Sequence, residues 1–449
     1  MKQEPLRSTL AYIEWFPSTS WLIFMVLPLI AQLPSLDLWS TRVQFFIVIG
    51  CAIGFLLSDL FAFRKPYSDN PRCFQTVSNI LMAIIFTSIM CVTTATHLAL
   101  MPKIPLLLAW DLSSSESLTG EVAKARAEAT KLLSYGSWID YICTWSLVIF
   151  APLSILLWYK LKHYWTALLS FLWISFYAVS TTAKFPLVIC TASILLCLCS
   201  ALPFLNRQIQ RLVIACILLI FVVVAILAYT SSPMFNPNSV FLPSSVAIAN
   251  NDPRTHITIA DKHRIWSAAP NEKRQKVTPI VAKTEALIYR IIFGPSDVSI
   301  RWYQYFTTVK PPLGFASTIL RPPPENRPSR LVANWAYVER FPSLYLSFAN
   351  ANASFDADAY SRAGGLGAAL AMCLILAARL CLMTLRCVGT FGLSLYCIGI
   401  VLLSLLPFQS SLQAILFVYG LWMIIGFALL LKIFPNIGGF FNLLPRKKL

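Results

Sequence analysis

Long apolar segments alternate with short polar ones along most of the chain. Runs of about 20 apolar residues are long enough to cross a bilayer as helices. The first run is the weakest, because its apolar stretch from Trp21 to Leu33 is short and contains Pro28. We predict ten membrane spans, at residues 15–34, 43–63, 76–101, 138–158, 164–182, 185–205, 211–230, 364–383, 389–408 and 413–434.

Two polar segments interrupt this pattern. Residues 102–137 contain apolar positions at helical spacing between 119 and 133, which predicts an amphipathic helix on the membrane surface. Residues 231–363 form a much longer loop, with predicted helices at 279–293, 296–309 and 331–350. We therefore divide the chain into spans one to seven (1–230), a large loop (231–363) and spans eight to ten (364–449).

Composition and charge support a membrane protein. Hydrophobic residues make up 57% of the chain and charged residues only 12%, which excludes an ordinary soluble domain. Lys and Arg number fourteen in the short loops and termini of one side and two in the short loops of the other. The positive-inside rule therefore predicts cytoplasmic termini, with both long loops on the outer, periplasmic side. The fold class is an all-α polytopic membrane protein.

The large loop is itself basic. It carries 15 Lys and Arg against 9 Asp and Glu, a surplus of six, on the side where the positive-inside rule gives no reason for it. The net charge of +17 is accounted for by this loop and by the cytoplasmic side, so nucleic acid is not a predicted partner. The loop contains no cysteine, which excludes a disulfide framework within it.

The order of these features resembles a known family. Ten spans, a long outer loop between the seventh and eighth, the segment Ala349–Tyr360 and the glycines of Gly364–Gly367 are similar to the Wzy-type oligosaccharide repeat-unit polymerases of O-antigen and exopolysaccharide. The segment from Tyr289 to Phe306, with an arginine before a proline and an aromatic pair, also resembles them. An Arg-x10-Gly pattern of some members is not matched, because Gly136 falls one position short of it from Arg126.

The resemblance implies a GT-C-type membrane glycosyltransferase of the bacterial inner membrane. Its implied donor and acceptor are glycan repeat units on undecaprenyl diphosphate at the periplasmic face. Membrane lipid, a flippase and a chain-length regulator are the other implied partners, with no cofactor and no metal. A related ligase family shares this architecture and transfers finished glycan to a lipid acceptor.

Arginines are the first candidates for the site, because a diphosphate leaving group needs fixed cations and the guanidinium is a permanent planar donor. Arg290 is the leading catalytic candidate, since no acid lies three or four residues away on its helix. For Arg301 the alternative to a role in the site is an ordinary ion pair with Asp297 at i−4. For Arg362 the alternative is a role at the membrane boundary. The substrate-binding candidates are Arg301, Arg340, Arg362, Arg126 and Lys184.

Other candidates supply a base or polar contacts. Asp356 and Asp358 are the catalytic carboxylates, able to deprotonate an acceptor hydroxyl; helix capping and a metal site are the alternatives for this pair. Ionisable groups near the outer ends of spans line cavities or snorkel to the interface. The further substrate-binding candidates are His97, Asp140, Asn352, Tyr303 and Tyr360, the two tyrosines as sugar contacts.

Three functions therefore remain open from the sequence, beside a scaffold or anchor with no catalysis. A polymerase transfers the growing glycan from undecaprenyl diphosphate to the next lipid-linked repeat unit. A ligase uses the same donor and another acceptor. A transporter of lipid-linked glycan is the third, although the chain lacks the internal repeats typical of transporters.

Overall fold

A computed structural model gives the architecture of the chain. It describes residues 14–31, 39–64, 76–101, 137–181, 184–201, 294–319, 326–338, 353–387, 389–407 and 412–433, with a few single positions outside these ranges. Every regular element in these ranges is a helix, and none of the described residues lies in a strand. The prediction of an all-α membrane protein is therefore confirmed at this level.

The helices follow the predicted apolar runs closely. Those before residue 202 are α2 (Phe16–Trp21), η1 (Leu22–Val26), α3 (Leu27–Ala31), α4 (Trp39–Arg64), α5 (Thr76–Leu100), α8 (Ser137–Trp145), η4 (Ser146–Phe150), α9 (Ala151–Lys160), α10 (Tyr164–Ser180) and α11 (Lys184–Ala201). Those after residue 293 are α16 (Gly294–Gln304), η8 (Tyr305–Val309), α17 (Ala316–Ile319), α18 (Pro328–Ala333), η10 (Asn334–Val338), α19 (Phe355–Met383), η11 (Thr384–Cys387), α20 (Gly389–Ser404), η12 (Ala414–Val418) and α21 (Leu421–Ile433).

Four stretches of the described helices are long and apolar enough to cross a membrane. They are Trp39–Ala62, Ile80–Leu100, Tyr141–Lys160 and Phe355–Arg386. Shorter apolar helices occupy Phe16–Val26, Tyr164–Ser180, Pro186–Leu198, Phe391–Ser404 and Leu421–Leu430. The predicted span at 211–230 lies outside the described residues, so the number of spans and their orientation stay predictions.

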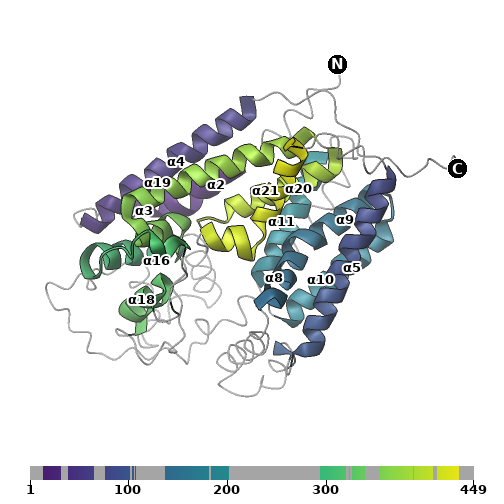
Figure 1. Cartoon of the computed structure of the whole chain (residues 1–449), viewed down its shortest axis with the longest axis horizontal. Coiled ribbons are helices and arrows are strands. Elements are labelled where there is room, and N and C mark those ends of the chain that lie inside the picture. The colour runs from purple at the N-terminus through teal and green to yellow at the C-terminus, as the bar shows by residue number, and fades with distance from the viewer. Residues whose placement is uncertain are drawn as a thin grey trace, which may run out of the picture.

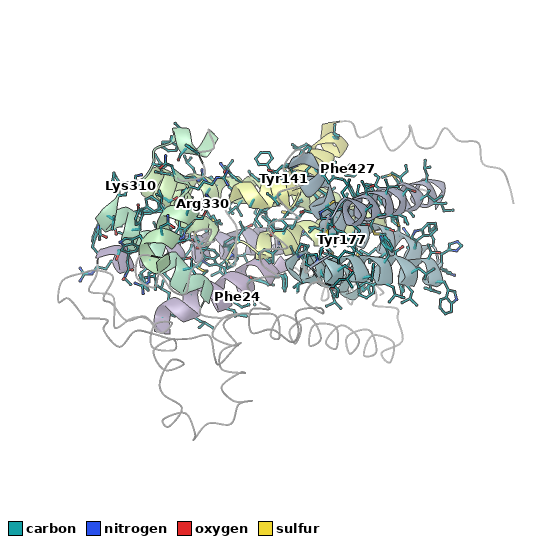
Figure 2. The ribbon with its side chains drawn as sticks, turned by 90° about the horizontal axis from the view of Figure 1, so that it is seen from below. Phe24, Tyr141, Tyr177, Lys310, Arg330 and Phe427 are labelled. Atoms are coloured by element: carbon teal, nitrogen blue, oxygen red, sulfur yellow. The ribbon has the colours of Figure 1, made fainter. Side chains whose placement is uncertain are left out.

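Two hydrophobic clusters organise the helices. The larger joins the first helical segment to α4, α5, α9–α11 and α19–α21, and the smaller joins α16, η8, α18 and η10 to the start of α19. Figure 1 places α16 and α18 at one end of the long axis and α5, α9 and α10 at the other. Figure 2 agrees from below, with Lys310 and Arg330 at one end and Tyr177 well removed from them.

Helix α19 is two helical segments that meet at Ala363 and Gly364, where the backbone leaves the helical region. Gly364 has φ +64° and ψ −153°, a conformation that is nearly confined to glycine. The sequence places a glycine at the point where the chain needs this conformation.

Contacts with α4 show how sharply the chain turns there. The ring of Phe355 lies 6.2 Å from that of Phe55, and Met372 Cε lies 2.8 Å from the place of a Cβ on Gly54. Residues 355 and 372 therefore meet neighbouring positions of α4, whereas a straight helix would separate them by about 25 Å. Residues 355–362, which we call the folded-back segment, thus return alongside the helix that follows them.

The folded-back segment is held from several sides. The Phe355 N–H donates to the Leu406 carbonyl at the end of α20 (3.2 Å), and the Leu313 N–H donates to the Ser361 carbonyl (2.9 Å). The Ser299 and Ser354 hydroxyls are 2.8 Å apart. Backbone and side-chain hydrogen bonds therefore connect this segment to α16, α20 and the chain after η8.

The helices predicted in the large loop are partly described. The helix predicted at 296–309 forms as α16 and η8 but begins at Gly294, because a proline in the first helical turn loses no hydrogen bond. Of its apolar side chains, Trp302, Tyr305 and Phe306 are buried, whereas Val309 is exposed. The helix predicted at 331–350 begins at Pro328, and residues 339–350 lie outside the described part.

Two neighbouring glycines test the fold-back. A Cβ on Gly367 would collide with the Ala359 carbonyl, whereas one on Gly365 would meet nothing within 4 Å. We expect Gly367→Ala to separate the two segments and lower the thermal unfolding temperature in detergent. Gly365→Ala should leave it unchanged or raise it, because alanine is the better helix former by about 1 kcal/mol. Equal effects of the two substitutions would contradict the turn at Gly364.

Candidate functional site

The folded-back segment carries the densest set of predicted site residues. Asp356 is fully buried at its start, and Asp356 Oδ2 accepts a hydrogen bond of 2.8 Å from the Tyr303 hydroxyl of α16. Asp356 Oδ1 has no hydrogen-bond partner, and no described residue forms an ion pair with this carboxylate. Asp356 therefore links α16 to α19 through this hydrogen bond, and its carboxylate is not accessible to a substrate in this structure.

Tyr303 is the other half of this contact. Its burial, and then the Asp356 carboxylate beside it, raise the pKa of the Tyr303 phenol well above its ordinary value. The phenol consequently stays protonated and remains a donor at physiological pH. Its ring is completely buried, so Tyr303 makes no sugar contact in this structure, and its role here is to position Asp356.

Asp358 has a different partner. Arg362 donates two parallel hydrogen bonds to the Asp358 carboxylate, from Nε to Oδ2 at 3.0 Å and from Nη2 to Oδ1 at 3.2 Å. Arg362 Nη1 also donates to the Ser317 carbonyl. The two side chains keep 11% and 10% of their surface exposed, in contrast to Asp356. Both carboxylates of the Asp-x-Asp pair are thus buried, but Asp358 keeps a small exposed share of its surface and Asp356 keeps none.

The turn beside Arg362 is open. A Cβ on Gly364 or Gly365 would have no neighbour within 4 Å. Tyr360 is half-buried there, with its ring 4.8 Å from that of Tyr303. Asp358 and Arg362, one helical turn apart, therefore share one face of the segment, whereas Tyr360 lies on the other face with Asp356 and Tyr303.

Arg301 lies in α16 and is 3% exposed, with Nη1 donating to the Gln304 side chain at 3.1 Å. The side chain of its predicted competitor, Asp297, lies outside the described residues. The structure therefore buries Arg301 on the helix that also carries Tyr303. In this conformation its guanidinium is enclosed.

Other predicted site residues are not described or lie elsewhere. Arg290, Arg340, Arg126 and Asn352 fall outside the described residues. Asp140 and Lys184 lie in the first turns of α8 and α11, but their side chains are not described. His97, at the end of α5, instead pairs through Nδ1 with the Tyr177 hydroxyl of α10. This pair belongs to the α5–α10 part of the molecule and not to the folded-back segment (Figures 1 and 2).

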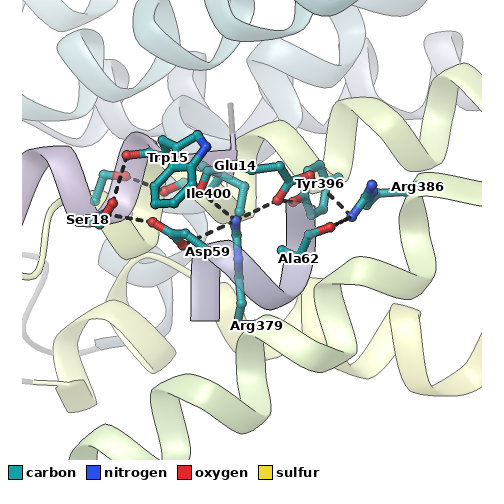
Figure 3. A network of polar contacts seen from close by, with 10 residues as sticks. Glu14, Trp15, Ser18, Asp59, Ala62, Arg379, Arg386, Tyr396 and Ile400 are labelled. Atoms are coloured by element: carbon teal, nitrogen blue, oxygen red, sulfur yellow. Dashed lines mark hydrogen bonds and ion pairs between the residues drawn. The ribbon is translucent and has the colours of Figure 1, made fainter. Parts of the chain in front are cut away.

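A second polar cluster, the Glu14 network, was missed from the sequence (Figure 3). The Glu14 carboxylate accepts hydrogen bonds from Arg379 Nη2 at 2.7 Å and from the Tyr396 hydroxyl at 2.5 Å. Arg386 Nη1 lies 3.3 Å from Glu14 Oε1. Arg379 Nη2 also approaches Asp59 Oδ1 at 3.5 Å, which closes a network of two carboxylates and two guanidinium groups.

The Glu14 network has balanced charges and holds helices together. It joins the segment before α2 to α4, α19, η11 and α20. Arg379 is 2% exposed, and its Nε and Nη1 have no hydrogen-bond partner. Two of the fourteen positive charges of one predicted membrane side, Arg379 and Arg386, are thus paired with carboxylates; Arg379 is buried and Arg386 half-buried.

One feature of the sequence pointed to this network. Asp59 lies within the predicted span 43–63 and Arg379 within the span 364–383. An ionisable side chain in an apolar helix needs a partner inside the protein, so opposite charges on two spans indicate a pair. The glutamate that completes the network precedes the first span and carries no such signal.

Comparison with known proteins adds no identification: no family model, no curated protein and no solved structure matches the chain. Within the described part of the chain, no three His, Cys, Asp or Glu side chains come together in a way that suits a metal ion. The geometry of the folded-back segment therefore stands alone as the basis for a functional argument.

The Glu14 network predicts a charge-dependent stability. Glu14→Gln leaves two buried guanidinium groups against one carboxylate, and we expect a loss of about 3–5 kcal/mol of unfolding free energy. The double variant Glu14→Gln/Arg386→Gln restores the balance of charge and should recover part of this loss. Thermal unfolding of both variants in detergent measures the difference. A double variant less stable than Glu14→Gln would show that charge balance is not the stabilising factor.

Proposed function

We propose that the protein polymerises lipid-linked oligosaccharide repeat units in the bacterial inner membrane, at its periplasmic face. The growing glycan leaves undecaprenyl diphosphate and is transferred to the next undecaprenyl-diphosphate-linked repeat unit. The observation that carries the proposal is the Asp358–Arg362 pair at the partly open turn of the folded-back segment. It puts a cation and a carboxylate together beside a long apolar helix, as a lipid diphosphate and a sugar hydroxyl require.

Each reacting group and each side chain has one role in the proposed reaction. A hydroxyl oxygen of the acceptor sugar forms a bond to the anomeric carbon of the donor glycan. The bond from that carbon to the diphosphate oxygen breaks, and undecaprenyl diphosphate leaves with the electron pair. Asp358 takes the hydroxyl proton, and Arg362 stabilises the negative charge of the departing diphosphate.

Asp358 is the better placed of the two candidate bases. Its side chain keeps 10% of its surface exposed, whereas Asp356 is fully enclosed and hydrogen-bonded to Tyr303. A base must come within hydrogen-bond reach of the proton that it removes. Asp356 accordingly positions the segment. Tyr360 packs against Tyr303 on the face away from Asp358 and is proposed as a sugar contact on the sequence argument alone.

Arg290 remains the leading second cation of the proposal, on the sequence argument alone. We expect Arg290→Ala to abolish long glycan while single repeat units are still made and exported. The reason is that loss of a fixed positive charge at the diphosphate removes several kcal/mol of transition-state stabilisation, on the order of 3 kcal/mol. Gel analysis of surface glycan from cells that carry the variant measures this directly. Long-chain ladders in Arg290→Ala would remove this residue from the mechanism.

Purified protein tests the reaction itself. Incubation with a synthetic undecaprenyl-diphosphate repeat unit should give a ladder of polymer with wild-type protein, and Asp358→Asn should lower turnover by about 100-fold, as loss of a general base does. Lys283→Gln, which changes another charge of the large loop, is the matched control. Transfer of a single glycan to a lipid acceptor, with no ladder, would replace the polymerase by the ligase.

A further inference from the structure

We propose that Asp358 is a built-in competitor for the diphosphate site of Arg362: in the empty protein it occupies the guanidinium that the diphosphate of the lipid carrier takes during turnover. The inference rests on the proposed function for the identity of the ligand. Its basis is the geometry of the ion pair and of the turn beside it. Asp358 is thereby both the counter-ion that keeps the site closed and the carboxylate set free when the donor binds.

The hydrogen bonds of Arg362 leave part of the guanidinium available. An arginine has one N–H on Nε and two on each terminal nitrogen. The Asp358 carboxylate accepts the Nε–H and one N–H of Nη2, and the Ser317 carbonyl accepts one N–H of Nη1. One N–H on Nη1 and one on Nη2 therefore have no partner among the described residues. They are the donors that a first phosphate oxygen can approach before the ion pair opens.

The turn next to Arg362 has space on one side. The helix from Gly364 to Met383 begins at this turn and the folded-back segment ends there, so a positive and a negative helix end both lie near Arg362 in the chain. Around Gly364 and Gly365 there is space, since a Cβ on either would meet nothing within 4 Å. Among the described residues, the turn therefore has open space on the side of Gly364 and Gly365.

Asp358 opposes this binding in two ways. Its negative charge repels a second anion, and its two oxygens hold the guanidinium edge that is best suited to bidentate contact. Both side chains are about nine-tenths buried, so solvent screens this repulsion only weakly. Asp356, two residues away, makes no contact with Arg362 and is held by Tyr303, so it has no part in the competition.

The opposite signs expected for two neighbouring substitutions test the proposal. Undecaprenyl diphosphate, without glycan, is titrated into protein held in lipid nanodiscs. Asp358→Asn should bind it about tenfold more tightly, because the repulsion and the competing contact are removed, and Arg362→Gln about tenfold more weakly. In the double variant Asp358→Asn/Arg362→Gln, the change at Asp358 should no longer tighten binding. Asp356→Asn, the matched carboxylate control, should not tighten it either.

Further arms separate the sources of phosphate and the effects on folding. Phosphatidylglycerol and inorganic pyrophosphate are titrated in parallel, and a preference for either over the carrier diphosphate would overturn the assignment of the ligand. Thermal unfolding is recorded for every variant, and Arg362→Lys keeps the charge without the planar donor fork. Weaker binding in both Asp358→Asn and Arg362→Gln, in step with lower stability, would show a purely structural ion pair. Binding of the carrier diphosphate does not require sugar transfer. If Asp358→Asn and Arg362→Gln change the affinity in opposite directions while the purified protein forms no polymer, only the proposed function is overturned.

Discussion

The turn at Ala363–Gly364 is the constraint on which the rest of this structure depends. It brings charged and hydroxyl-bearing residues back against α4, beside a cluster of apolar and aromatic side chains. Polar groups in such surroundings are tolerated only when they find hydrogen-bond partners. The partners come from α16, from the end of α20 and from the segment's own arginine. The shape of the turn therefore determines which carboxylate is fully enclosed and which keeps a small exposed share of its surface.

The two polar clusters lie far apart along the same helix and differ in character. Gly364, at the turn, and Arg379 are separated by about 22 Å of helix, and the residues between them are apolar apart from one cysteine. The Glu14 network is closed, balanced in charge and shared among five elements, as expected of a contact that holds helices together. The Asp358–Arg362 pair is local, partly exposed and next to open space. Those differences favour the folded-back segment as the functional end.

Much of the helical architecture follows from the sequence, because apolar runs of membrane length have few alternatives to a helix. The i, i+4 spacing of Asp358 and Arg362 is typical of an ion pair and the glycines after it of a helix break, although we predicted neither. The direction of the turn was not predictable, since it depends on contacts with α4 and α20. Glu14 and Arg379 are 365 positions apart, a partnership that no local pattern reveals. The burial of Tyr303 was missed for the same reason, because its partner Asp356 reaches it only through the fold-back.

The central claim is that the lipid diphosphate binds at the turn of the folded-back segment and not at the Glu14 network. The most direct measurement is photocrosslinking with an undecaprenyl diphosphate analogue that carries the reactive group next to the diphosphate, followed by mass spectrometry of the labelled peptides. The account predicts label between Tyr360 and Leu366, which excess undecaprenyl diphosphate suppresses. Label concentrated around Arg379 and Arg386, or label at the turn that excess carrier does not suppress, would contradict it.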